Sequence, residues 1–198
     1  MKKYEYGKIN DLNKSMVKNG IDDGIIQKIM GSGDLIKPKS RSEEKAEWCF
    51  NAMNKMDELL DENTRKKVRE DCACCLGGKR HKVCKEINEK YSTPQERIKA
   101  ISETYPVFGY EIKITGKGKY EVSFFNNTNP EFKCVCQAGS LYELNKKWSK
   151  TWCYCCGGHV KHHLETLLGK KVNVKIISSS LTSKGRKNCH FELVEMNQ

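Results

Sequence analysis

The sequence has no long apolar run, and no window comes near the roughly 18 consecutive apolar residues that a membrane-spanning helix needs. Behind Lys2 and Lys3 there is no apolar stretch either, so we expect no secretory signal. A protein that stays in the cytoplasm keeps its thiols reduced, and a framework of disulfide bonds is therefore not expected. Together these absences predict a cytoplasmic protein that has no membrane partner.

What the sequence does contain is cysteine and positive charge: eleven cysteines and a formal net charge of +11 in 198 residues. The lysines and arginines form short, scattered clusters, and no nucleic-acid recognition motif joins them. Charge alone then predicts a nonspecific association with nucleic acid and no specific nucleic-acid partner. Eleven thiols without an export signal favour metal or redox chemistry instead.

The pattern of apolar residues changes from helical to alternating near residue 106. Helical spacing and helix caps mark residues 40–105, whereas residues 106–198 hold alternating strands around a helical segment at 153–168. This order predicts an α+β fold, in which a helical amino-terminal half packs on an antiparallel sheet and the carboxyl half carries a Cys/His-bearing helix. We expect residues 1–39 to be a helical extension with a linker, and residues 40–198 to be a single domain.

Two segments carry the same pattern, C-x-C-C, followed by a Gly-Gly pair and by a histidine six residues after the last cysteine. The two segments are Cys72-x-Cys74-Cys75, with His81, and Cys153-x-Cys155-Cys156, with His162. Each contains a C-x-x-C pair, a spacing that lets two thiolates bind one tetrahedral ion. The glycines permit the tight backbone turn that such a site needs. The repeated pattern therefore indicates metal binding.

Two arrangements of a metal site are open from the spacing. The two C-x-x-C pairs could combine into one site, or Cys156, His159 and His163 could bind the ion from a single helix face, because they lie at i, i+3 and i+7. The predicted metal ligands are Cys72, Cys75, Cys153, Cys155, Cys156, His159 and His163. Zinc is the expected ion, because it takes thiolate and imidazole ligands together. Thiolates alone would also satisfy an iron–sulfur cluster.

The same cysteines could carry out chemistry. If a helix starts near Cys153, the next two cysteines lie in its first turn, where the helix dipole lowers the pKa of a thiol. A histidine of this helix could then serve as base to a cysteine nucleophile. This alternative predicts a cysteine- or zinc-dependent hydrolase of a small C–N or C–S compound. A thiol–disulfide role for either C-x-x-C pair is a further possibility. By contrast, Cys49 and Cys189 fit the apolar stripes of their segments and are predicted to be core residues.

The carboxyl half carries a resemblance to known domains. A Cys/His-bearing helix is followed by a strand at 171–177 and by the motif G-x-x-x-C-x-F-x-L, which starts at Gly185. Over residues 105–195 the chain resembles vinyl-reductase-type ligand-binding domains and is similar to the L-2-amino-thiazoline-4-carboxylate hydrolase family. Over residues 40–195 it resembles an uncharacterised bacterial family with paired C-x-C-C and Gly-Gly segments. The resemblance implies an α+β fold with a pocket for a small organic molecule, sometimes beside a metal.

Overall fold

The structure is a computed structural model that describes residues 3–104, 111–124, 132, 134, 136 and 146–196. It divides into two compact units. The first unit comprises Met1–Cys72 and Cys134–Cys155, and the second comprises Ala73–Lys133 and Cys156–Gln198. Within the described residues, none of the helices combines the length and the apolar character that crossing a membrane requires.

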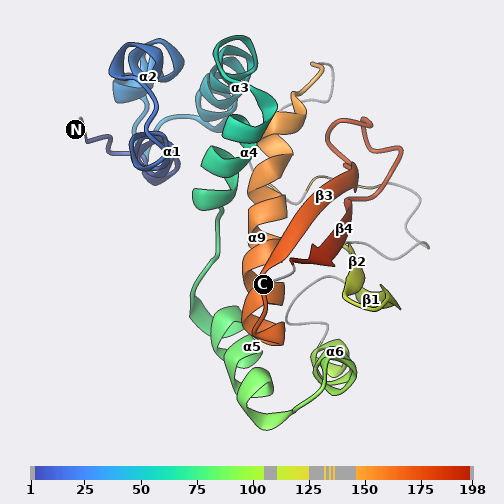
Figure 1. Cartoon of the computed structure of the whole chain (residues 1–198). Coiled ribbons are helices and arrows are strands. Elements are labelled where there is room, and N and C mark those ends of the chain that lie inside the picture. The colour runs from blue at the N-terminus through green and yellow to red at the C-terminus, as the bar shows by residue number, and fades with distance from the viewer. Residues whose placement is uncertain are drawn as a thin grey trace. The chain divides into compact units, whose positions relative to one another are not determined.

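The first unit is built from helices (Figure 1). Its elements are α1 (Gly7–Lys18), α2 (Asp23–Met30), the 3-10 helix η1 (Gly33–Leu35), α3 (Ser42–Leu59), α4 (Glu62–Asp71) and the first turns of α9 (Lys150–Leu168). Buried residues recur at helical spacing, as Ile9, Leu12 and Met16 do in α1, so each helix turns one apolar face inward. Both α1 and α3 contact α2 and α4. The helices of residues 1–39 therefore pack together with α3 and α4 in one unit.

The second unit holds helices and an antiparallel sheet (Figure 1). Its elements are α5 (Gly78–Lys90), α6 (Pro94–Glu103), β1 (Glu111–Gly116), β2 (Lys119–Ser123), β3 (Val172–Ser178), β4 (His190–Glu195) and α9 from residue 156 onward. The strand order is β1-β2-β4-β3, and every neighbouring pair is antiparallel. In this register Leu193 on β4 pairs with Tyr120 on β2 and with Val174 on β3, and all three are buried.

Helix α9 lies against the sheet within the second unit. A Cβ atom added at Gly157 would meet Val174 Cγ1 at 3.5 Å, so the helix passes directly over β3. Val160, Leu164 and Leu167 follow at helical spacing and are almost completely buried. The predicted α+β class is confirmed: helices make up the amino-terminal half, and the antiparallel sheet and the Cys/His-bearing helix lie in the carboxyl half.

Candidate metal centre

The predicted ligands are divided between the two units. Those in the first unit are Cys72, Cys153 and Cys155, and those in the second are Cys75, Cys156, His159 and His163. All eleven cysteines are free thiols in the structure. Within the described residues, no three His, Cys, Asp or Glu side chains are already assembled as a metal-binding group. The donors that do come together must therefore be identified one contact at a time.

In the second unit, histidines of α9 form hydrogen bonds with the turn that carries the first cysteine motif. His159 Nδ1 lies 3.1 Å from the Cys74 carbonyl oxygen, and His163 Nε2 lies 2.9 Å from that of Cys75. Because a carbonyl oxygen can only accept, the ring nitrogen in each of these bonds carries the hydrogen. Two successive carbonyls thus fix the tautomers of two histidines.

The surroundings keep these imidazoles neutral. Burial, together with the charge of neighbouring His159, lowers the pKa of His163 to about 4. Burial also lowers the pKa of His159, and Arg80, whose Nη1 lies 3.5 Å from His159 Nε2, acts in the same direction. Burial lowers the pKa of His162, and the charge of the nearby His81 lowers it further. At neutral pH each ring therefore donates with one nitrogen and keeps a lone pair on the other.

The lone pair of His162 faces a second histidine. His81 Nδ1, near the start of α5, lies 3.1 Å from His162 Nε2, and the two rings are stacked with centroids 5.1 Å apart and planes 25° apart. These two histidines occupy equivalent positions in the two cysteine motifs. The predicted ligand set omits both, although their identical spacing was the signal that could have identified them.

The backbone at Cys75 is strained. Its φ of 61° lies in the left-handed region, which costs a non-glycine residue on the order of 1–2 kcal/mol. The Cys75 and Cys74 side chains are exposed, whereas Cys156 on α9 is half-buried. The hydrogen bond from His163 to the Cys75 carbonyl holds the strained turn in place. The exposed thiol of Cys75 therefore lies on the same short segment whose carbonyls accept hydrogen bonds from His159 and His163.

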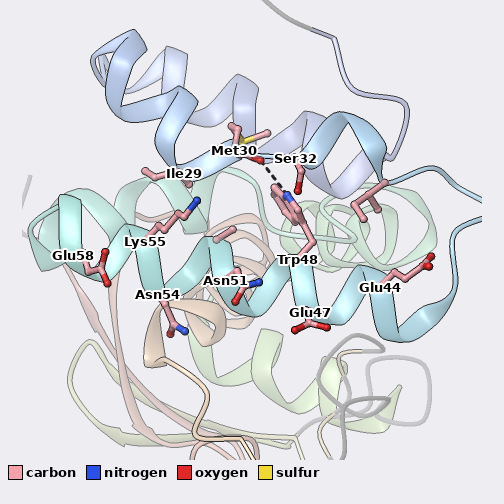
Figure 2. A pocket seen from close by; sticks show the side chains of 13 residues that line it. Ile29, Met30, Ser32, Glu44, Glu47, Trp48, Asn51, Asn54, Lys55 and Glu58 are labelled. Atoms are coloured by element: carbon pink, nitrogen blue, oxygen red, sulfur yellow. Dashed lines mark hydrogen bonds between the residues drawn. The ribbon is translucent and has the colours of Figure 1, made fainter.

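The structure also contains hollows outside the histidine cluster. In the first unit a pocket of about 480 Å³ lies beside α3 and the end of α2. Trp48 forms part of its wall and donates from Nε1 to the Met30 carbonyl at 3.1 Å, while Lys55 reaches across toward the α2 end (Figure 2). In the second unit a hollow of about 520 Å³ is lined by serine, threonine and basic residues between Ile177 and Lys187. The small-molecule ligand implied by the sequence resemblance stays a prediction for either of them.

One comparison with known proteins gives a result for almost the whole chain. The family of unknown function DUF6144 matches residues 6–198. The chain belongs to this family. Neither the curated proteins nor the solved structures gave a match. The matched region of this chain includes both cysteine motifs and the sheet, and membership of DUF6144 assigns no activity.

Proposed function

We propose that the protein binds a divalent transition metal ion, with zinc as the expected ion, through His81 Nδ1 and His162 Nε2 in the second unit. The observation that carries the proposal is their separation of 3.1 Å. Zinc binds imidazole nitrogen at about 2.0–2.1 Å, so two nitrogens on one tetrahedral ion lie about 3.4 Å apart. A shift of a few tenths of an ångström would convert the present contact into a bidentate metal site.

The hydrogen bonding of His162 supports this role. A histidine that binds a metal commonly donates its other N–H to a backbone carbonyl or a carboxylate, which orients the ring and fixes its tautomer. We expect the other N–H of His162 to donate to the Leu76 backbone, which raises the pKa of the ring. Burial lowers this pKa and keeps the ring neutral, so Nε2, which faces His81, is available without the loss of a proton. His159 is less suited to be a ligand, because its Nε2 already faces the Arg80 guanidinium.

We propose Cys75 as the third ligand. Its thiol is exposed, and its backbone carbonyl is bound by His163, which adjoins His162 on α9. The left-handed backbone at Cys75 points its side chain in a direction that an extended or helical residue would not give it. Strained backbone of this kind is common at binding sites. Two imidazoles and one thiolate leave a fourth tetrahedral position for a water molecule.

Replacing either histidine of the pair should abolish tight metal binding. We expect His81→Asn and His162→Gln to weaken zinc affinity at least roughly 100-fold, because each amide can keep a hydrogen bond but offers no imidazole nitrogen. The measurement is competition of reduced, metal-free protein with a zinc-binding dye. His190→Gln is the matched control, since His190 lies on β4 beside Glu121 and should leave affinity unchanged.

Cobalt provides an independent measurement of the same site. Co²⁺ added to the metal-free protein should give the visible absorption of a tetrahedral site and a sulfur-to-cobalt charge-transfer band, and Cys75→Ser should remove the latter alone. Wild-type protein that neither retains zinc after purification nor develops these bands would overturn the proposal. Equal zinc affinity in the wild type and in both histidine variants would do the same.

A further inference from the structure

The hollow beside the end of β3 is positively charged. It has a volume of about 520 Å³ and lies entirely in the second unit. Among the described residues that line it, two are cationic, Arg186 and Lys187, and none carries a carboxylate. The volume falls within the roughly 300–1,000 Å³ that small-molecule sites usually have. Size and charge together favour an anionic small molecule as the occupant.

Arg186 has most of its hydrogen-bonding capacity available. Its side chain is exposed, and its Nε donates to the Ser183 carbonyl at 3.1 Å. Within the part of the chain that the structure describes, the guanidinium has neither a carboxylate partner nor a second hydrogen bond. The bond at Nε orients the planar group and leaves Nη1 and Nη2 available, and these are nitrogens that can bind two oxygens of one phosphate group.

Ser183 also fixes the backbone that carries the second cation. Its hydroxyl oxygen accepts a hydrogen bond from the Lys187 N–H at 3.0 Å and donates to the Lys187 carbonyl at 3.3 Å. Between these residues the chain turns through two successive left-handed positions, Lys184 at φ 54° and Gly185 at φ 76°. A lysine in this conformation is strained, and residues of this kind cluster at binding sites. The turn brings Arg186 and Lys187 back to the hollow that Ser183 lines.

Two further lining residues determine which anion fits. Thr182 is exposed, and its Oγ1 makes one long hydrogen bond, 3.5 Å to the Ser179 carbonyl, so this hydroxyl can turn and donate to a phosphate oxygen. Ile177 is 49% exposed and adds an apolar surface to the same hollow. An inorganic anion would leave this surface in water, whereas an organic group attached to the anion would cover it.

We propose that the hollow binds a small organic molecule through a phosphate monoester group. The phosphate accepts hydrogen bonds from Arg186 Nη1 and Nη2, from Lys187 Nζ and from the Thr182 hydroxyl, and the organic part packs on Ile177. A phosphate monoester carries nearly two negative charges at pH 7, which the two cations of the hollow balance. The site needs no metal ion, so it is independent of the proposed zinc site.

The first test is a titration of the isotope-labelled, metal-free full-length chain with phenyl phosphate, followed by NMR of the backbone amides. At about 0.15 M salt, where attraction between distant exposed charges is screened, we expect saturable shifts confined to residues 177–187. Arg186→Gln should weaken binding at least roughly 10-fold, because it removes a charged, two-pronged donor. Lys99→Gln removes an exposed positive charge on α6 and is the matched control, which should bind as the wild type does. Unchanged affinity in a folded Arg186→Gln variant would overturn the proposal.

The second test separates the organic part of the ligand from its phosphate. Ile177→Thr keeps a β-branched residue in the strand, so the fold should be retained, but it removes apolar surface. We expect it to weaken phenyl phosphate roughly threefold and to leave the affinity for inorganic phosphate unchanged. Inorganic phosphate that binds the wild type as tightly as phenyl phosphate does would contradict an organic ligand. An oligothymidylate that binds through Arg186 while phenyl phosphate does not bind would also overturn the proposal and would assign the hollow to nucleic acid.

Discussion

Acidification should destabilise the metal-free protein in part through His163. Burial holds its pKa near 4 in the folded chain, whereas the ordinary value is 6.5. Between these values the unfolded chain binds more protons than the folded one, so the free energy of unfolding falls as the pH is lowered. The stabilisation is complete above pH 6.5, and about 2 kcal/mol is lost by pH 5 and about 3 kcal/mol by pH 4. Urea unfolding in the presence of a chelator at several pH values measures this slope.

The variant that isolates this effect is His163→Gln. The glutamine amide can replace Nε2 as donor to the Cys75 carbonyl but does not titrate, so the stability of the variant should fall less steeply between pH 6.5 and pH 4. Lys99→Met, at an exposed position of α6, is the control and should retain the wild-type slope. Identical slopes in the wild type and in His163→Gln would show that the ring is not held neutral by its surroundings.

Much of the fold could be predicted because its signals are local. Apolar residues alternate at Tyr120 and Val122 and again at Phe191 and Leu193, and a period of two residues identifies a strand without knowledge of its partner. The position of β4 between β2 and β3 is different, because it depends on contacts between distant segments. The sequence pattern therefore predicted the class correctly and could not supply the strand order.

The candidate metal centre shows the same division between local and distant information. Counting positions along one helix favoured His159 and His163 as ligands, because i and i+4 neighbours share a face. In the structure both rings donate to the carbonyls of a turn that lies far earlier in the chain. The contact between His81 and His162 likewise joins two segments that are far apart in the sequence. Their equivalent positions in the two motifs were the one sequence signal that could have indicated this contact.

Arg69 is another residue whose role could not be inferred from its neighbours. It follows closely on the cluster Arg65-Lys66-Lys67, and charged runs of this kind usually form solvated helix faces. In the structure the side chain is buried against Trp152, which belongs to a helix much later in the sequence. Burial of a charge depends on what packs over it, and a sequence window around α4 contains none of those groups.

Removing the Arg97 side chain should destabilise the second unit and weaken metal binding together. Its guanidinium donates to three backbone carbonyls at helix ends, those of Asn88 at 3.1 Å, Tyr91 at 2.8 Å and Leu168 at 2.6 Å. The first two end α5 and the third ends α9, so one side chain ties together the helices that carry His81 and His162. Arg97→Met leaves these carbonyls without a charged donor, and we expect a loss of about 3 kcal/mol in the free energy of unfolding.

The matched control for Arg97→Met is Lys99→Met on the same helix. Lys99 is exposed, so its replacement removes a positive charge and adds the same side chain without disturbing a helix end. We expect Lys99→Met to change the free energy of unfolding by less than about 0.5 kcal/mol. Zinc affinity, measured under conditions where both variants are folded, should fall only in Arg97→Met, because the distance between His81 and His162 depends on how α5 is held against α9. A destabilised Arg97→Met with unchanged zinc affinity would mean that the histidine pair is positioned by the turn at residues 74–76 alone.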